Sequence, residues 1–410
     1  MRFARIRIWP LCNLRCVSSI TLSLKCETAS GTDYARVRML IVSTKHIDVA
    51  AECIPTHQLL NVAGERVPDR ELDHYVAKLT ESDLADFLRD MVVLRRLDHE
   101  ATALQRQGEL GLWAPLLGQE AAQIGSVRAA RDSDFIFPSY REHGVAWARG
   151  VKAEDLLSVW RGAQSSGWNP NEVNIACQQI VIGAQTLHAA GYGMGIKFDG
   201  TDDVAITYFG DGATSQGDVS EAMVFAASYQ APVLFFCQNN QWAISEPVAL
   251  QSRTQIADRA HGFGLKTWRV DGNDILAVYA ATQAALAHCR NGLGPTFVEA
   301  VTYRMGSHTT ADDPTRYRKD EELQKWKAKD PIDRLVKYLH VIGADVQSYE
   351  QRAQNAADDL AAQLRAAITA MPDPAVGELF DNVYSEAHEP STRAREGYLS
   401  YLSEFEGEGH

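Results

Sequence analysis

The sequence contains no uninterrupted apolar run of the roughly 18 residues that a membrane-spanning helix needs, so it predicts no transmembrane segment. Basic residues are also in deficit: 40 Lys and Arg stand against 53 Asp and Glu, and the formal net charge is −13. A nucleic-acid-binding surface needs concentrated positive charge, so this balance argues against such a partner. We therefore expect no membrane and no nucleic acid among the partners of this chain.

Cysteine gives no structural pattern either. The seven cysteines are an odd number at scattered positions, which does not fit a framework of disulfides. No internal repeat is visible, which argues against a repeat architecture. What the chain does have is 410 residues, 45% of them hydrophobic, which is enough for a large buried core.

Acidic residues are scarce in the first 38 positions, where Glu27 and Asp33 accompany seven Lys or Arg residues. An Arg-rich, acid-poor start can be a mitochondrial transit peptide, but no amphipathic period is visible here. We therefore favour a non-native start with Met39 as the true initiator, and keep a targeting extension as the alternative. The first interpretation predicts a cytoplasmic protein, and the second predicts a protein of the mitochondrial matrix. We expect residues 1–38 to be disordered in either case.

Three further regions follow along the chain. Residues 39–78 are mixed in character and are predicted to form an N-terminal arm that lies on another part of the protein. Residues 79–340 are predicted to form the main domain, and residues 341–410 a helical region with an acidic tail. The main domain opens at Thr80, which begins a capping-type helix start ahead of apolar residues at helical spacing.

Short apolar runs alternate with helical stretches in the main domain. The runs are bounded by Gly, Asp, Asn and Pro, and they cover residues 204–209, 232–237, 266–270 and 296–302. Helical stretches lie between them, for example over residues 219–229 and 275–290. This alternation predicts an α/β fold, a parallel sheet with helices on both faces. Ligands of such sheets bind beyond the carboxyl ends of the strands.

Two polar residues follow neighbouring runs. Asp211 lies in Gly210-Asp211-Gly212 after the first run, and Asn240 lies 29 positions later, after the second. A carboxylate and an amide oxygen are hard ligands that suit magnesium, which keeps few protein ligands and completes its shell with substrate phosphates. The flanking glycines let the backbone approach a diphosphate closely. The pair therefore predicts a diphosphate cofactor anchored through a metal ion.

The sequence around Asp211 and Asn240 carries a longer motif. Residues 208–218 (Tyr-Phe-Gly-Asp-Gly-Ala-Thr-Ser-Gln-Gly-Asp) and 235–245 (Phe-Phe-Cys-Gln-Asn-Asn-Gln-Trp-Ala-Ile-Ser) resemble the thiamin diphosphate signature of one family. That family is the alpha subunit of the thiamin diphosphate-dependent decarboxylase (dehydrogenase) component of 2-oxo acid dehydrogenase complexes. The resemblance covers roughly residues 79–339. It implies the thiamin diphosphate-binding fold, with thiamin diphosphate and Mg²⁺ as cofactors.

The resemblance also implies roles for residues near the metal and the phosphates. Asp211 and Asn240 would ligate Mg²⁺ through side chains, and Trp242 through its backbone carbonyl. Tyr140 and Arg141 match the segment that contacts the phosphates, and a guanidinium offers a planar fork to a phosphate. The backbone around the signature completes the predicted cofactor contacts at Gly210, Gly212 and Ala213.

Further roles follow from three other matching segments. The main chains of Ile180 and Ile182 would face the aminopyrimidine ring, while their side chains are expected in the core. Ile244 matches the bulky residue that forces the cofactor to bend. His308 lies in a segment similar to the mobile loop of the family and would be the catalytic residue that faces diphosphate and substrate. Thr309 stands where animal relatives carry a phosphorylated Ser, which puts that regulation in doubt.

Two departures bear on the substrate. Gln238 stands where some branched-chain relatives carry an Arg, and Ala114 where pyruvate-specific relatives often have His. A smaller, apolar wall favours a branched-chain 2-oxo acid over pyruvate, while acetoin dehydrogenases share the same motifs. A degenerate scaffold subunit is the non-enzyme alternative, against which the intact Asp211, Asn240, Arg141 and His308 argue.

The activating glutamate of the family has no match in this chain. The resemblance implies that a beta subunit supplies it, in an assembly of two alpha and two beta chains. It also implies that the acyl group passes to the lipoyl domain of the transacylase component.

Overall fold

The computed structural model describes residues 20–28, 31–39, 53–381 and 383–405. The chain divides into two compact units, Met1–Cys53 and Ile54–His410. In the first unit, β1 (Ile20–Thr28) pairs antiparallel with β2 (Gly31–Met39). The rest of that unit up to residue 52 lies outside the described residues, and the expectation for residues 1–38 stays a prediction.

The second unit is built on a six-stranded sheet in the order β3-β9-β10-β6-β5-β4. Every neighbouring pair is parallel, and the strands are β3 (Thr56–His57), β4 (Phe135–Phe137), β5 (Ala205–Gly210), β6 (Val233–Asn239), β9 (Lys266–Asp271) and β10 (Thr296–Val301). This confirms the predicted α/β fold with a parallel sheet. The four predicted strands correspond to β5, β6, β9 and β10.

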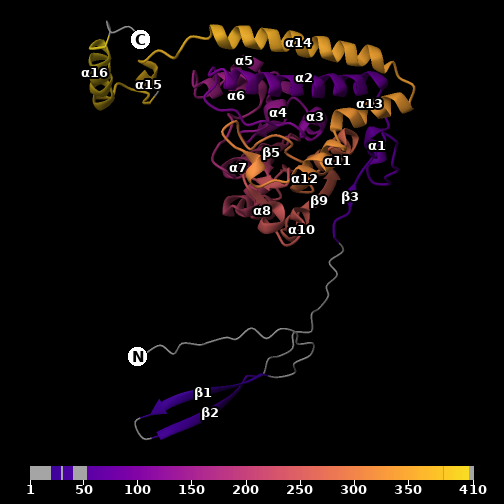
Figure 1. The fold of residues 1–410 in the computed structure, drawn as a ribbon, viewed down its shortest axis with the longest axis vertical. Helices are drawn as coiled ribbons and strands as arrows, with labels where there is room; N and C mark the ends of the chain where they lie inside the picture. The colour runs from indigo at the N-terminus through magenta and orange to yellow at the C-terminus, as the bar shows by residue number, and fades with distance from the viewer. Residues whose placement is uncertain (1–19, 29–30, 40–52, 382, 406–410) are drawn as a thin grey trace. The chain divides into compact units, whose positions relative to one another are not determined.

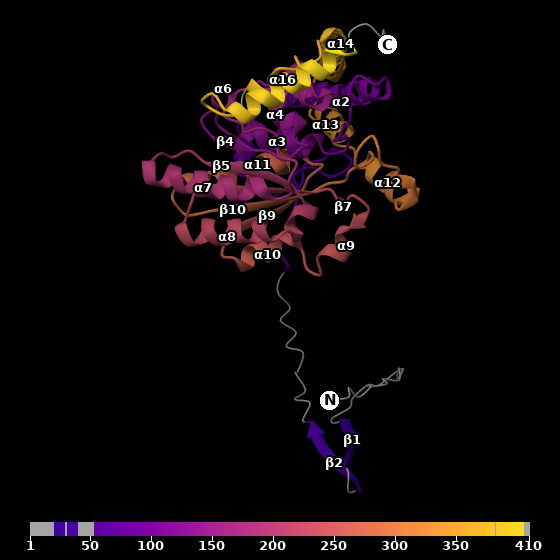
Figure 2. The same ribbon diagram turned by 90° about the vertical axis from the view of Figure 1, so that its left-hand side faces the viewer.

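Helices cover both faces of the sheet (Figures 1 and 2). The core on one face is shared by α2 (Glu81–Arg106), α3 (Glu120–Ala129), α11 (Ile275–Arg290) and α13 (Pro331–Val341), and α14 (Val346–Ala370) packs on α2. The other face packs against α7 (Ala184–Asp199), α8 (Gly217–Tyr229) and α10 (Ile256–Gly262). Strand β6 shows why the sheet needs both layers, because Leu234 and Phe236 belong to one core, and Phe235 and Cys237 to the other.

Shorter elements complete the second unit. They are α1 (Asp73–Val76), α4 (His143–Ala148), α5 (Ala153–Arg161), α6 (Pro170–Val173), η1 (Asp211–Ser215), β7 (Trp242–Ala243), β8 (Glu246–Pro247), α9 (Val248–Gln251), η2 (Pro314–Arg316), α12 (Asp320–Lys327), α15 (Glu378–Asp381) and α16 (Glu389–Ser403). Within the described part of the chain, no helix combines the length and apolar character needed to cross a membrane.

The predicted N-terminal arm contributes directly to the sheet. Its residues Thr56 and His57 form the edge strand β3, which pairs with β9. Its Leu59, Leu60 and Leu72 are fully buried in the core. The arm is therefore part of the folded core from residue 54 onward, while residues 40–52 lie outside the described residues.

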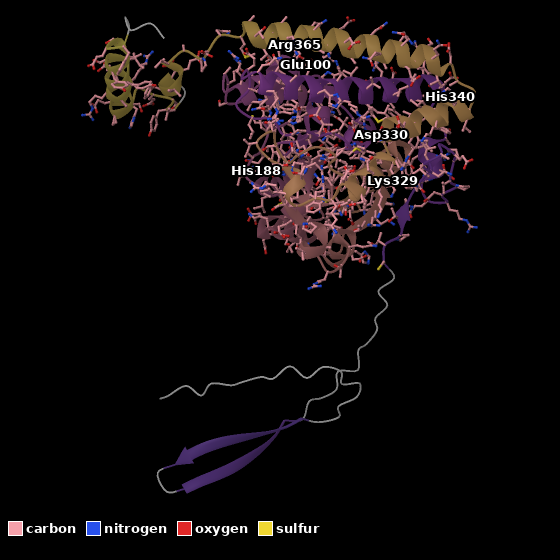
Figure 3. All side chains as sticks on the ribbon, viewed as in Figure 1. Glu100, His188, Lys329, Asp330, His340 and Arg365 are labelled. Carbon is pink, nitrogen blue, oxygen red and sulfur yellow. The ribbon has the colours of Figure 1, made fainter. Side chains whose placement is uncertain are left out.

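Helix α2 begins where the sequence predicted. The Thr80 hydroxyl accepts the Asp83 N–H at 3.3 Å, and the Asp83 carboxylate accepts the Thr80 N–H at 2.7 Å, which closes a capping box. Helix α14 packs along α2 (Figure 3), where Glu100 on α2 forms ion pairs with Arg365 and with Arg96, the latter at 2.9 Å. These contacts hold the C-terminal helical region to the main domain.

A fully buried carboxylate on α2 fixes the segment 112–118, which we call the strap. Asp98 accepts the Trp113 indole N–H at 2.8 Å and the Leu116 and Leu117 backbone N–H groups at 3.1 and 3.2 Å. Burial raises the pKa of Asp98 from 3.8 to about 6, although these hydrogen bonds favour the ionised form. The strap is thereby anchored to α2 at several points.

Asp98 should make the stability of the fold depend on pH. When the pKa of a carboxyl group is higher in the folded protein than in the unfolded chain, its contribution to stability is fully present below the unfolded-state pKa. That contribution is lost as the pH rises through the folded-state pKa. Between about pH 4.5 and pH 7.5, wild type should lose about 2 kcal/mol more unfolding free energy than Asp98→Asn, measured by urea denaturation. The half-exposed Asp86 on the same helix gives the control Asp86→Asn, which should retain the wild-type slope. Equal slopes in all three proteins would contradict the assignment.

Candidate functional site

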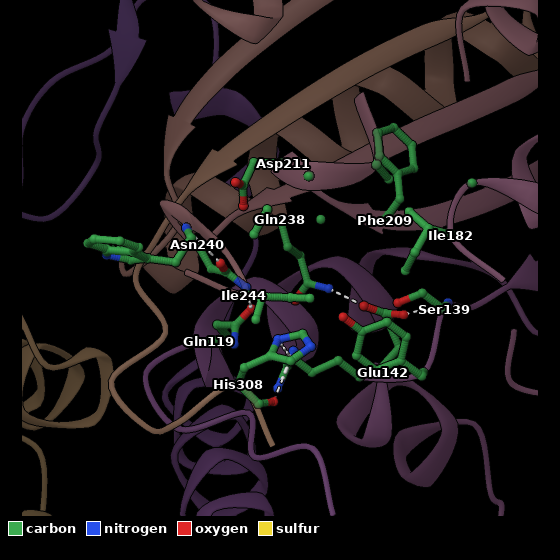
Figure 4. Close-up of a pocket in the computed structure, with 18 of the residues that line it drawn as sticks. Gln119, Ser139, Glu142, Ile182, Phe209, Asp211, Gln238, Asn240, Ile244 and His308 are labelled. Atoms are coloured by element: carbon green, nitrogen blue, oxygen red, sulfur yellow. Dashed lines mark hydrogen bonds between the residues drawn. The ribbon is translucent and has the colours of Figure 1, made fainter. Parts of the chain in front are cut away.

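Asp211 and Asn240 follow the ends of two adjacent central strands. Gly210, the last residue of β5, pairs with Gln238 near the end of β6. Asp211 and Asn240 are both buried, and they lie near each other at this edge of the sheet (Figure 4). The structure therefore brings together the two residues from which the metal prediction started, at the carboxyl ends of parallel strands.

A cleft of about 220 Å³ opens at this edge of the sheet. It is lined by ten of the eleven residues predicted to bind the cofactor, namely Tyr140, Arg141, Ile182, Gly210, Asp211, Gly212, Ala213, Asn240, Ile244 and His308, and by Trp242. The eleventh, Ile180, lines a second cleft beside it. The roles of these residues as ligands stay predictions.

The acidic side of the cleft carries a carboxylate without a cationic partner among the described residues. Asp211 Oδ2 accepts a hydrogen bond from Gln251 Nε2 at 3.2 Å, and burial raises the pKa of Asp211 to about 6. The Asn240 amide donates to Gln119 Oε1 at 3.2 Å, and its oxygen accepts the Trp242 N–H at 3.3 Å. Asp211 and Asn240 thus offer the oxygen donors that a hard cation prefers.

The predicted third ligand has a different partner in the structure. The Trp242 carbonyl accepts a hydrogen bond from Arg304 Nη1 at 3.1 Å. A carbonyl oxygen has two lone pairs, so this bond leaves room for a second partner. In the described residues no three His, Cys, Asp or Glu side chains converge as a metal cluster. A cation here would therefore need the amide and main-chain oxygens as well as Asp211.

Two buried guanidinium groups lie at the basic side of the cleft: Arg141 lines it, while Arg304 does not line it but contacts residues that do. Arg141 is 5% exposed and donates to the carbonyls of Pro115 and His308, the latter at 3.0 Å. Arg304 is fully buried and donates to the carbonyls of Trp242 and Ile244 and to the Tyr317 hydroxyl. Throughout the described ranges, neither forms an ion pair with a carboxylate. Two buried cations with neutral partners favour an anionic ligand.

His308 connects these two cations. Its Nδ1 atom lies 3.2 Å from Arg141 Nη2 and 3.3 Å from Arg304 Nη1. Guanidinium groups only donate, so Nδ1 accepts and the ring proton is on Nε2. Burial, followed by the charges of both arginines, lowers the pKa of His308 to about 3. The imidazole is therefore neutral at physiological pH in the chain without a bound anion.

The loop that carries His308 is fixed by its own hydrogen bonds. The backbone N–H of His308 donates to Asp312 Oδ2 at 2.8 Å, and the Tyr317 hydroxyl donates to the same oxygen at 2.5 Å. Arg318 donates to the carbonyls of Arg304, Met305 and Gly306. These contacts place the His308 ring at the boundary between the two clefts, both of which it lines.

Ile244 occupies a strained turn. It is the first of two residues that join β7 to β8, and its φ is +55°. A β-branched side chain rarely adopts a positive φ, and this turn position normally favours glycine. The side chain is 55% exposed, so packing does not account for it. Strain of this kind is typical of functional positions.

The expectation that the Ile180 and Ile182 side chains belong to the core is wrong. Ile180 is 66% exposed and Ile182 is 44% exposed. The apolar run suggested burial, but the segment passes over the clefts before α7 begins, and nothing in the described chain covers it. The second cleft, of about 240 Å³, is lined by Leu112, Ala114, Tyr140, Trp160, Ile180, Ile182, His308 and Thr309.

Several site residues had no assigned role in the sequence prediction. Glu142 is buried, accepts the Ser139 N–H and the Gln238 amide at 2.5 Å each, and has a pKa that burial raises. It lies in the same short segment as Arg141, which was the available signal. Arg304 lies three residues after the end of β10, so a cation just beyond a strand end was the corresponding signal.

A family comparison agrees with this geometry. The family model "Dehydrogenase E1 component" matches residues 89–374. The chain therefore belongs to the dehydrogenase E1 component family, which implies dependence on thiamin diphosphate. It is an oxidoreductase of the 2-oxo acid dehydrogenase type.

Individual relatives cover most of the chain. The 3-methyl-2-oxobutanoate dehydrogenase subunit alpha of Mycobacterium tuberculosis (strain ATCC 25618 / H37Rv) is 45% identical over 330 residues, which are 80% of this chain and 89% of the relative. The pyruvate dehydrogenase E1 component subunit alpha of Bacillus subtilis (strain 168) is 38% identical over 351 residues, 85% of this chain and 94% of the relative. That of Bacillus cereus is 40% identical over 333 residues, 81% and 89% respectively.

Asp211 should limit stability in the absence of a cation. Asp211→Asn removes a buried charge, so the unliganded variant should be about 1–3 kcal/mol more stable than wild type at pH 7.5. Calorimetry should show thiamin diphosphate binding with Mg²⁺ weakened by roughly tenfold or more, since a hard carboxylate ligand is lost. Asp218→Asn, in the first turn of α8, is the control and should change neither quantity. Unchanged cofactor affinity in Asp211→Asn would refute the metal-ligand role.

Proposed function

We propose that this chain is the alpha subunit of a branched-chain 2-oxo acid dehydrogenase. The reaction is the thiamin diphosphate-dependent oxidative decarboxylation of an acid such as 3-methyl-2-oxobutanoate, followed by acyl transfer to the lipoyl group of the transacylase. A cytoplasmic location is part of the proposal, with the mitochondrial matrix as the alternative.

The charges buried in the main cleft support cofactor binding. Among the described residues, Asp211 lines the cleft without a cationic partner and Arg141 lines it without an anionic one. Arg304, which contacts the lining residue His308, also has no anionic partner there. A Mg²⁺–diphosphate unit supplies both missing partners at once. Gly210 has open space where a side chain would project, and a Cβ at Gly212 would approach the Ala243 Cβ to 2.6 Å. The residues present therefore fit the cofactor and its metal.

Each side chain has a task that follows from its position. Asp211, Asn240 and the Trp242 carbonyl would hold Mg²⁺, while Tyr140 and Arg141 would hold the phosphates. Thiamin diphosphate, when bound, supplies the carbon nucleophile and accepts the electron pair that carbon dioxide leaves behind. The exposed Ile244 side chain lines the cleft and would restrict the conformation of a cofactor bound there. His308 presents Nε2–H as a donor, and a bound anion raises its pKa from about 3, which makes it a better proton carrier.

The second cleft carries the choice of substrate. Its walls are mainly aliphatic and aromatic, with Leu112, Ala114, Ile180 and Ile182 beside His308. Burying a branched alkyl chain against such walls is worth about 0.8 kcal/mol per CH₂. The identity of 45% to a subunit of a 3-methyl-2-oxobutanoate dehydrogenase agrees with this choice.

A beta subunit completes the proposed enzyme, as two alpha and two beta chains. The resemblance assigns the activating glutamate to that partner, as no segment of this chain matches it. Exposed apolar side chains on α7 and α8 form a surface that suits a protein partner, namely Leu187, Tyr192, Val224, Phe225 and Tyr229. The relatives are themselves named as alpha subunits.

Substrate turnover tests this proposal. The co-expressed alpha–beta pair should decarboxylate 3-methyl-2-oxobutanoate with a kcat/KM roughly tenfold or more above that for pyruvate, because the cleft buries the extra methyl groups. Acetoin should be a poor substrate. The chain purified alone, with cofactor and Mg²⁺, should show no turnover above background. A preference for pyruvate or acetoin would select one of those alternatives, and absence of all activity in the pair would leave the scaffold interpretation.

His308 should act mainly after cofactor binding. In the alpha–beta pair, His308→Ala should lower acyl transfer to a lipoyl domain by roughly 10²-fold, the usual effect of losing a proton-transferring group. Thiamin diphosphate affinity should fall less than in Asp211→Asn, because no metal ligand is lost. The exposed His340 on α13 gives the control His340→Ala. Full overall activity of His308→Ala would show that this histidine is a bystander.

A further inference from the structure

A second histidine lies behind the wall of the substrate cleft. His143 is fully buried at the start of α4, and it lines neither cleft. Its Nε2 atom lies 3.0 Å from the carbonyl oxygen of Ala114, and its Nδ1 atom lies 3.2 Å from Gln178 Nε2. A carbonyl only accepts and an amide NH₂ only donates, so the ring is neutral with its proton on Nε2.

The two partners of this ring belong to two different segments that line or adjoin the cleft. Ala114 lies on the strap and lines the cleft itself. Gln178 precedes Ile180 by two residues, and its segment is tied to the loop after β4 by the bridge between Ser139 and Gln179. The His143 imidazole therefore links the main chain of Ala114, which lines the cleft, to the side chain of Gln178, which precedes the lining residue Ile180.

Aromatic contacts fix the orientation of the ring. The His143 ring stacks on Trp113 with centroids 4.0 Å apart and an angle of 20°. Trp160, which also lines the cleft, meets the ring edge-on at 5.8 Å. The other side of the strap is held by Asp98. The strap is thus clamped between α2 and His143, and the ring has little freedom to rotate.

We propose that His143 is a positioning residue for acyl-chain selectivity, because it sets the separation of the Ala114 and Ile180 walls. This inference rests on the proposed function in one respect, namely that the second cleft receives the acyl chain. His143 itself touches neither substrate nor cofactor. Its two hydrogen bonds would determine how wide the cleft is, and hence which chains pack against both walls.

Two substitutions separate the two hydrogen bonds. In His143→Gln, the side-chain amide can reach the Ala114 carbonyl, but the acceptor for Gln178 is lost. In His143→Asn, the amide oxygen can accept from Gln178, but the donor to Ala114 is lost. Gln178→Met removes the hydrogen bond from Gln178 to His143 Nδ1. Gln178 is partly exposed, so this substitution leaves the core undisturbed. The exposed His340 gives the control His340→Asn.

The experiment uses the co-expressed alpha–beta pair with cofactor and Mg²⁺. The kcat and KM values are measured for pyruvate, 2-oxobutanoate and 3-methyl-2-oxobutanoate, together with thiamin diphosphate affinity and Tm. All three variants should change the ratio of kcat/KM for the branched acid over that for pyruvate by roughly tenfold, the scale of one or two methylene contacts. The change should reside in KM, with thiamin diphosphate affinity within about twofold of wild type.

The outcomes separate this inference from the proposed function. The wild-type preference reports the function, whereas the ratio of variant to wild-type selectivity reports His143, whichever acid wild type prefers. A selectivity change in Gln178→Met and in at least one His143 variant supports the proposal. Unchanged selectivity overturns it, even if Tm falls, because a merely structural role would affect all acids equally. A wild-type pair inactive on every acid overturns both proposals.

Discussion

Buried charge of both signs in one cleft is the constraint on which the site depends. Asp211 lies at the end of β5 with a raised pKa, while Arg141 and Arg304 are held by carbonyl oxygens and a hydroxyl. Each of these charged groups is buried away from water, and no described residue forms an ion pair with it. Burial of an unpaired charge lowers the stability of the fold. The main-chain carbonyls keep the arginines in place, and His308 accepts from both. The cleft is therefore organised in advance for a ligand that carries both a cation and an anion.

The sheet makes this arrangement possible. The pairing of Gly210 with Gln238 sets Asp211 beside the end of β6, and both faces of β6 are buried. Phe236 belongs to one core and Phe235 to the other, and a shift of one residue along β6 would exchange them. Packing against the two helical layers therefore fixes the register of this strand. The position of the metal-binding candidates is thus determined by hydrophobic packing several residues away. The same logic applies to the strap, which Asp98 and His143 hold from two sides.

The sequence predicted those parts of the structure that have strong local signals. The long apolar strands, the cap at Thr80 and the placement of Asp211 and Asn240 all follow from patterns within a few residues. Strands β3 and β4 have only two and three residues, too few for a period to show. Ile180 and Ile182 have a core-like pattern, yet their environment is decided by distant elements. The partners of Arg304 and His143 also lie far along the chain, so no local pattern reveals them.

The turn at Ile244 has a consequence for how this chain responds to selection. A β-branched residue at φ +55° stores strain of about 1–3 kcal/mol, and glycine would release it. Selection for heat resistance alone would thus remove the side chain that reaches over the cleft. In a library of variants at position 244, the residue favoured by selection for folding yield should therefore differ from the residue favoured by selection for turnover. Under the proposed function, the isoleucine is a compromise in which some thermodynamic stability is given up to keep a bulky group at the cofactor site.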